Sequence, residues 1–201
     1  MKPKSYFQHI LAIDTETSGL FFDKDSPCFN PETGEHYQIV SIGLIVADSE
    51  TLLPVEQLYL EIKWNGESLW DAKAQSIHGL TLKHLEENGV DEEQAVVEIC
   101  NLILKYWGPT SSVSLLGHNV ATFDIHFLKQ LLRKFDIEIK FSRRHVDSLS
   151  AGFAAFCAYD SDQLFEAVGF KKREQHNALT DAKQALNSIR VIRQLVQDSL
   201  Q

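Results

Sequence analysis

An acidic pair near the N-terminus has the residue types and spacing of a metal-binding site. Asp14 and Glu16 follow a short apolar run, and on a strand their side chains leave the same face. Neighbouring carboxylates repel each other and raise each other's pKa, and a divalent cation bound by hard oxygen ligands removes that cost. Such pairs are common, so this one alone also fits two solvated acids at a strand end.

A third carboxylate, Asp124, lies on the apolar face of an expected helix over residues 122–135. It precedes Phe127 by three residues and Leu131 by seven, the spacing of one helix face. We expect Thr122 to cap this helix, which puts Asp124 in the first turn, where the helix dipole favours an anion. An inward carboxylate is costly without a partner. Binding a cation and satisfying free amides at the helix start are both open interpretations.

The spacing of His176 and Asp181 predicts a contact between their side chains if Asn177 is the N-cap of the last helix. The two residues then occupy the positions that meet in a hydrophobic staple, which brings imidazole and carboxylate together. Asp181 also lies four residues before Ala185 on the buried stripe and lacks an obvious protein partner. The alternative is a surface histidine beside a helix-start acid. A histidine titrates near neutral pH and can accept a proton from water, and two metals roughly 3.5–4 Å apart can bind the attacking and leaving oxygens of a phosphodiester.

The surrounding elements alternate as in an α/β protein, and we expect one domain over 1–201 with its core at about 8–198. The expected strands are 9–13, 38–47, 55–62, 112–116 and 137–141. The expected helices are 91–107, opened by a capping box, then 122–135, 148–158, 161–168 and 178 to near the end. The segment 18–37 is long for a hairpin and is either a substrate-side wall or a surface loop.

In this order the motifs resemble those of the DEDDh 3′–5′ exonucleases, a ribonuclease H-like family that includes the proofreading subunit of bacterial replicative polymerase. The similar segments are Asp14–Leu20, His118-Asn119 with Phe123-Asp124, and His176–Ala182. The histidine five residues before the last aspartate is typical of this branch rather than of the branch that uses tyrosine. Ile77–Thr81 is similar to a family segment that lies against the terminal nucleotide. The similarity spans about residues 10–185.

The resemblance implies a mixed five-stranded sheet with helices on both sides, and a role for each motif residue. Asp14 would bridge two Mg²⁺ ions, for which Mn²⁺ can substitute. Glu16 and Asp181 would bind the metal that holds the water, and Asp124 would support the second. His176 would be the base, and nucleoside 5′-monophosphates would be the products. We expect the substrate contacts at Thr15, His78, Asn119 and Phe123, although Phe123 equally fits a packing role.

The charge balance argues against a broad basic surface, since the net charge is −9 and the pI about 5.3. A locally positive site is still expected once metals bind. Lys171–Arg173 could hold phosphate beside the site. Three scattered cysteines and the lack of a long apolar run favour a cytoplasmic protein without a membrane segment.

The expected partners are 3′ ends of DNA or RNA, and the short stretch after the last helix predicts a free-standing enzyme without a polymerase-tethering tail. An endonuclease on the same fold and a non-catalytic nucleic-acid-binding or regulatory module are the alternatives.

Overall fold

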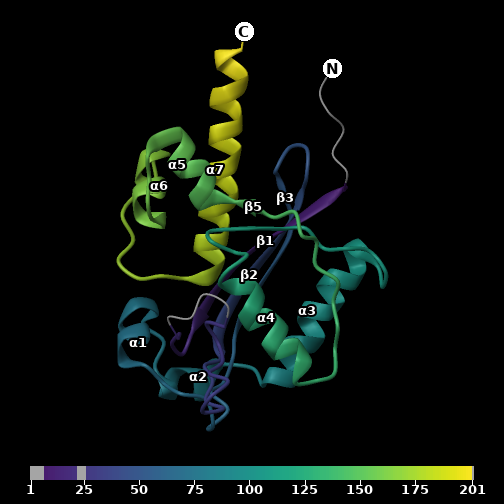
Figure 1. The fold of residues 1–201 in the computed structure, drawn as a ribbon, viewed down its shortest axis with the longest axis vertical. Coiled ribbons are helices and arrows are strands. Elements are labelled where there is room, and N and C mark those ends of the chain that lie inside the picture. Colours follow the sequence, from purple (N-terminus) through teal and green to yellow (C-terminus); the bar gives the residue numbers. More distant parts are fainter. Residues whose placement is uncertain (1–6, 22–25, 201) are drawn as a thin grey trace.

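Five strands form one mixed sheet in the order β3-β2-β1-β4-β5 (Figure 1). The computed structural model describes residues 7–21 and 26–200. The central strand β1 (His9–Thr17) pairs antiparallel with β2 (Ile39–Asp48), which pairs antiparallel with β3 (Pro54–Glu61). On its other side β1 runs parallel to β4 (Leu115–Gly117), and β4 runs parallel to β5 (Val146–Asp147). The expected mixed five-stranded sheet is therefore confirmed.

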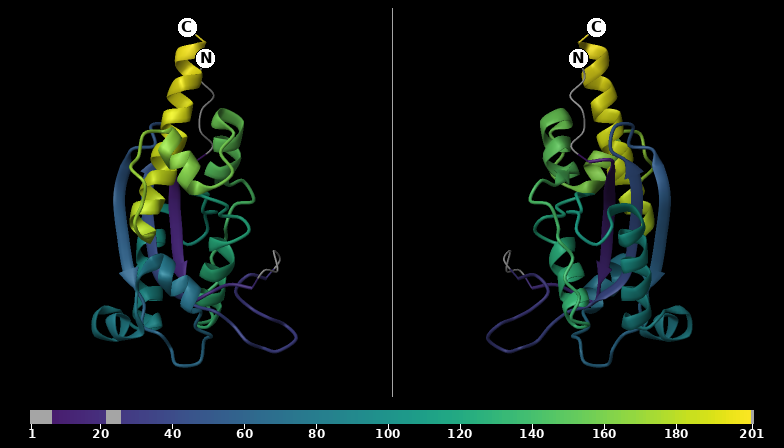
Figure 2. Two further views of the ribbon diagram at one scale, coloured as in Figure 1. Left: turned by 90° about the vertical axis from the view of Figure 1, so that its left-hand side faces the viewer. Right: turned by 90° about the vertical axis from the view of Figure 1, so that its right-hand side faces the viewer.

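Seven helices accompany the sheet in the described part of the chain. They are α1 (Ala72–His78), α2 (Leu82–Asn88), α3 (Glu92–Trp107), α4 (Asp124–Arg133), α5 (Ser148–Phe156), α6 (Ser161–Ala167) and α7 (Ala178–Ser199). Figure 2 shows α7 on one side of the sheet and α4 on the other. None of these helices combines the length and the apolar character needed to span a bilayer.

The alternation of β1 divides the core into two clusters. Leu11 and Ile13 are fully buried among residues of α3 and α4, whereas Ile10 and Ala12 are buried against α7. Because side chains alternate along a strand, Asp14 continues the face that packs on α7. The packing of the apolar half of β1 thus decides the side of the sheet on which its acidic end projects.

The expected strand at 137–141 is wrong in position. The described residues there form a single bridge, between Val113 and Phe141, and the strand beside β4 is β5, where Leu116 pairs with Val146. Ile137, Ile139 and Phe141 do pack against the α3–α4 cluster. Their apolar alternation therefore reflects burial of one edge of a loop and not pairing in a sheet.

Helices α1 and α2 are additions to the sequence expectations, which placed no helix between 62 and 91. Both have side-chain N-caps: Asp71 accepts a hydrogen bond from the amide of Lys73 at 2.8 Å, and Thr81 accepts one from the amide of His84 at 3.1 Å. At seven residues each they are too short to show a clear helical period.

Candidate active site

The carboxyl end of β1 presents the two motif acids toward the N-terminus of α7. Glu16 is 8% exposed and follows Asp14 on the same face of the strand. Gly43 on β2 makes room for this approach, because a Cβ there would lie 2.4 Å from the backbone of Ala178 and Leu179. Only glycine lets the first turn of α7 sit this close to the sheet.

Asp124 opens α4 and is 2% exposed. The hydroxyl of Thr15 donates a hydrogen bond to its Oδ1 at 2.8 Å. The helix is not capped by Thr122 as expected, since its N-cap is Phe123 and the Thr122 hydroxyl bonds to Asn119 instead, at 2.6 Å to Oδ1. Asp124 therefore does point inward, with one neutral donor as its side-chain partner among the described residues.

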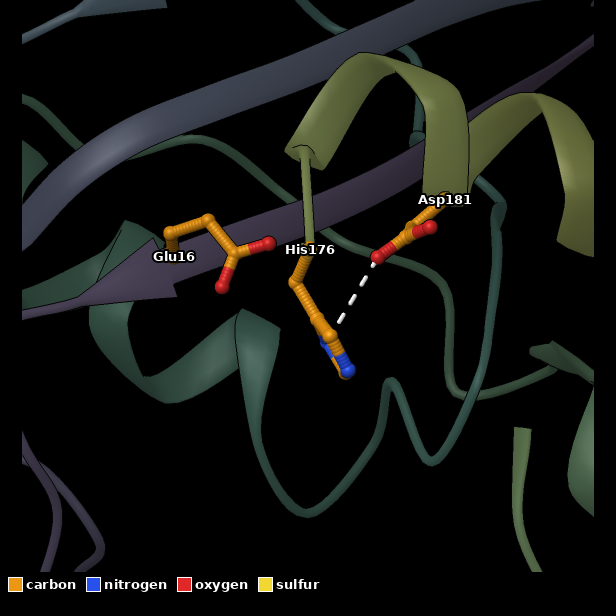
Figure 3. A group of neighbouring side chains, drawn as sticks. All are labelled: Glu16, His176 and Asp181. Carbon is orange, nitrogen blue, oxygen red and sulfur yellow. Dashed lines mark ion pairs between the residues drawn. The ribbon is translucent and has the colours of Figure 1, made fainter. Parts of the chain in front are cut away.

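The last motif has the local geometry that its spacing predicts. Asn177 is the N-cap of α7, and its Oδ1 accepts the amide of Thr180 at 3.0 Å. Nδ1 of His176 lies 3.6 Å from Oδ2 of Asp181, which is 2% exposed (Figure 3). The cap thus places the imidazole beside the carboxylate, and Figure 3 shows Glu16 approaching the same space from β1.

Asp181 has a protein partner, contrary to the sequence expectation. Nη1 of Arg173 lies 2.7 Å from its Oδ2. The same guanidinium pairs with Asp162 and lies 4.9 Å above the ring of Phe165, and its side chain is only 7% exposed. Arg173 was expected at most to touch phosphate. The polar run Lys171–Arg173 carries no sequence signal that one of its three cations is buried.

The four carboxylates, Asp14, Glu16, Asp124 and Asp181, are here called the acidic cluster. Burial, followed by the charges of Asp124, Glu16 and Asp181, raises the pKa of Asp14 well above its ordinary value. Burial first, and then the charges of Asp181 and Asp124, raises the pKa of Glu16 to about 8. Burial raises that of Asp124 to about 7, against the hydrogen bond from Thr15. The charge of Arg173 opposes the shifts at Asp14 and Glu16 without cancelling them, so these groups resist ionisation until a further positive charge joins them.

A divalent cation fits this cluster. Glu16, His176 and Asp181 each offer a ligand atom within 4.8 Å of the others. Oε1 of Glu16 and Oδ1 of Asp181 are buried without a hydrogen-bond partner among the described residues. Unpaired buried carboxylate oxygens are costly, and they are the ligands that hard cations such as Mg²⁺ prefer. One member of this trio, Glu16, is joined along β1 by Asp14.

The surroundings of His176 favour the neutral form of its imidazole. Burial lowers its pKa, and the nearby Arg173 lowers it further, while Asp181 and Asp162 oppose the shift. The backbone amide of His176 donates to the carbonyl of Ile77 at 3.1 Å, which ties it to the end of α1. A neutral ring at this position can accept a proton at neutral pH.

His78, at the end of α1, lies beside the loop that carries His176. It is 5% exposed, and its Nδ1 accepts the amide of Leu80 at 3.0 Å. Burial lowers its pKa to about 4, so the ring is neutral. Gly79 has φ +74° and packs on Gln175, where a Cβ would come within 2.6 Å of the side chain. A substrate contact for His78 stays a prediction.

The other expected substrate contacts have mixed surroundings. Asn119 is exposed in a left-handed conformation at φ 62°, on the turn before α4. Phe123 is half-buried with its ring centroid 5.0 Å from that of Phe127, which favours the packing role. The hydroxyl of Thr15 already donates a hydrogen bond to Asp124. Contacts of Thr15, Asn119 and Phe123 with substrate remain predictions.

Comparison with known proteins relates the whole arrangement to nucleases. The family model RNase_T, described as exonuclease, matches residues 11–188. An oligoribonuclease of Ralstonia nicotianae is 24% identical over 92% of this chain and 81% of its own length. An oligoribonuclease of Haemophilus influenzae is 25% identical over 93% of this chain and 94% of its own.

Solved structures share the fold at low sequence identity. Exonuclease I of E. coli in complex with single-stranded DNA aligns with a TM-score of 0.71 and 16% identity, over 93% of this chain. The chain spans only 41% of that protein. The nuclease domain of 3′hExo, a DEDDh family member bound to rAMP, aligns with a TM-score of 0.68 and 16% identity, over 97% of this chain and 95% of that one. The fold is thus of the ribonuclease H-like class.

Proposed function

The chain belongs to the RNase_T family of exonucleases, and we propose that its acidic cluster and His176 hydrolyse the 3′-terminal phosphodiester bond of single-stranded nucleic acid with two Mg²⁺ ions. The 3′–5′ exonuclease activity and the dependence on divalent metal go with the family. The residue roles, the choice of Mg²⁺ and the substrate are the proposal. The observation that carries it is the set of buried, unpartnered oxygens on Glu16 and Asp181 within reach of His176.

In this proposal the carboxylates hold the metals, and the protein controls the proton. Asp14, Glu16 and Asp181 would hold one ion and Asp14 with Asp124 the other, with Mn²⁺ able to replace Mg²⁺. When bound, the two ions would bind the attacking water and the leaving oxygen and stabilise the charge of the transition state.

His176 is neutral, lies at the open edge of the cluster and accepts the proton of the water as the water attacks phosphorus. The P–O bond to the 3′ oxygen of the preceding nucleotide breaks. The chain end keeps that oxygen, which takes a proton from solvent and becomes a 3′ hydroxyl, and a nucleoside 5′-monophosphate leaves.

Single-stranded RNA is the substrate we propose to test first. Two relatives are named oligoribonucleases, and they cover 92–93% of this chain. A structural neighbour was solved with rAMP and another with single-stranded DNA. Both sugars therefore belong in the test.

The test compares linear and covalently closed circular single strands of RNA and of DNA, each with Mg²⁺, with Mn²⁺ and with EDTA. We expect release of 5′-monophosphates from linear strands only, and only with metal. Efficient cutting of circles would support an endonuclease instead. Binding of linear strands without any hydrolysis under every condition would support a non-catalytic module.

A further inference from the structure

A groove separate from the acidic cluster runs between the loop 26–37 and the outer face of α4. Its volume is about 620 Å³. The loop contributes Cys28, Phe29 and His36, and the helix with its C-cap contributes Lys129, Arg133 and Lys134. We call this the α4 groove. Figure 2 shows the loop projecting from the end of the sheet on the side where α4 lies.

The wall formed by the loop is structured and attached to the helix. Phe29 and His36 form an antiparallel bridge, and the turn between them closes with a bond from the amide of Gly34 to the carbonyl of Asn30 at 2.8 Å. Nε2 of Gln130 on α4 donates to the carbonyl of Tyr37 at 2.9 Å. Residues 22–25 of the expected 18–37 loop lie outside the described residues. The described part is a braced hairpin, which favours a wall over a loose surface loop.

The groove is basic in a protein whose net charge is −9. None of its lining residues is a carboxylate. Lys134 is held by Glu92 at 2.9 Å, but Lys129 and Arg133 form no ion pair with any carboxylate in the described part of the chain. Nε2 of His36 is buried without a hydrogen-bond partner among those same residues. Lys129 Nζ lies 5.9 Å over the ring of Phe141, a contact that leaves its charge unneutralised. Two cations without a carboxylate partner and an unsatisfied ring nitrogen suit an anionic ligand with several polar atoms.

An aromatic surface accompanies these cations. Phe29 is 41% exposed and lines the groove together with the buried Cys28. An exposed ring beside lysine and arginine is the combination that binds single-stranded nucleic acid, since bases stack on the ring and cations hold the phosphates. Simple inorganic anions would use only the cations.

The positions of Lys129 and Arg133 along α4 set a minimum distance between the groove and the acidic cluster. Asp124 opens α4, and Lys129 and Arg133 follow five and nine residues later. At 1.5 Å per residue these positions lie about 7 and 14 Å along the helix, and at 3.6 residues per turn they lie on the side of α4 away from Asp124, so the path between them and the acidic cluster is longer than the axial distance. A stacked strand advances about 3.4 Å per nucleotide, so this range corresponds to a minimum of roughly two to four nucleotides.

We propose that the α4 groove binds the substrate strand at least two to four nucleotides upstream of the scissile bond, with its phosphates on Lys129 and Arg133 and a base on Phe29. This proposal rests on the proposed function, which identifies the bound strand as the substrate. The groove makes the enzyme select strands of about four nucleotides or more over dinucleotides, a choice that the acidic cluster alone does not make.

The test is the double variant Lys129→Gln/Arg133→Gln, assayed on a single-stranded hexanucleotide and on a dinucleotide. We expect KM for the hexanucleotide to rise roughly tenfold, so that its advantage over the dinucleotide largely disappears. The dependence of log KM on log salt should fall by about 1.4, at about 0.7 for each lost phosphate contact. Phe29→Ala should raise the same KM about fivefold or more.

The control is Lys105→Gln/Arg190→Gln, which removes the same charge from exposed positions on α3 and α7, where Lys105 forms an ion pair with Glu56 of β3. An unchanged preference for the hexanucleotide in the groove variant, or an equal loss in the control, would overturn the proposal.

Equilibrium binding of the labelled hexanucleotide, followed by fluorescence anisotropy without catalysis, separates the two proposals. If wild-type protein releases no nucleotide, the proposed function fails. Loss of hexanucleotide affinity in the groove variant alone would still support the groove, and equal affinity in all three proteins would overturn it.

Discussion

The acidic cluster and the α4 groove flank the same helix, but they are built on opposite principles. The cluster gathers four carboxylates from β1, α4 and α7 in a buried setting, with Asp124 and Asp181 each 2% exposed. The groove gathers cations on an open surface, and Arg133 is exposed. Burial makes each acid of the cluster costly, so its residues have few tolerable alternatives. Exposed cations cost almost nothing, which leaves their positions free to vary.

The largest effect expected is at the cluster. Asp14→Asn removes a charge that we place between both metals, which supply several kcal/mol of transition-state stabilisation, so kcat should fall by about 10³-fold or more. The loss should be equal for dinucleotides and hexanucleotides, in contrast to the groove variant. Single-turnover assays at saturating Mg²⁺ measure it, with circular dichroism to verify folding. A loss that depended on strand length would contradict the separation of the two regions.

His176→Ala should lower kcat by about 10²- to 10⁴-fold, the usual contribution of a general base. The pH profile gives a sharper result. Activity falls as pH drops through the pKa of the base, and burial and Arg173 hold the pKa of His176 below its ordinary value. At saturating metal the acid limb of wild type should therefore lie below pH 6.5, and the variant should lack that limb. A limb that survives in the variant would assign the base elsewhere.

The buried cation Arg173 predicts a smaller effect, in which its removal strengthens metal binding instead of weakening activity. Arg173→Gln removes a positive charge 2.7 Å from Asp181, so divalent cations should bind several-fold more tightly. The acid limb should also move to higher pH, because Arg173 lowers the pKa of His176. Mn²⁺ titration by calorimetry measures the affinity, and Lys172→Gln is the control. Weaker binding in Arg173→Gln would show that the guanidinium positions Asp181 for the metal.

The smallest effect expected is on stability. The raised pKa of Glu16, from 4.5 to about 8, means that the folded state holds a proton that the unfolded state releases. Without metal, stability is greatest below about pH 4.5 as far as this group is concerned, and is lost as pH rises toward 8. With EDTA, the melting temperature should therefore fall by a few degrees between pH 6 and 8. Mg²⁺ should raise it more at pH 8 than at pH 6.

Glu16→Gln is the control for that measurement. Its side chain has no proton to release, so the melting temperature in EDTA should change less between pH 6 and pH 8. An EDTA profile with the same slope in both proteins would refute the assignment of the effect to Glu16.

The contrast between the two regions also explains which features could be predicted from the sequence. The fold class and the family were predictable, because the motif acids follow a buried strand or open a helix, where spacing dictates direction. Asn177 as the cap of α7 was read correctly for this reason, and it brought His176 to Asp181.

Other features were hidden because their residue types are ordinary. Arg173 has the same appearance as Lys172 beside it, and only the tertiary structure buries it against Asp181. The α4 groove joins positions about a hundred residues apart, so neither half shows a pattern alone. The strand expected at 137–141 failed because alternation records burial, which a loop edge can share with a strand.

The central claim is that the acidic cluster and His176 remove nucleotides one at a time from a 3′ end. The most direct measurement is a time course on a 5′-labelled hexanucleotide with Mg²⁺, with the products separated by length. The account predicts a ladder that shortens by one nucleotide per step, with unlabelled 5′-monophosphates released and the label retained on the shrinking strand. Early release of a labelled mononucleotide, or a first cut inside the strand, would contradict it.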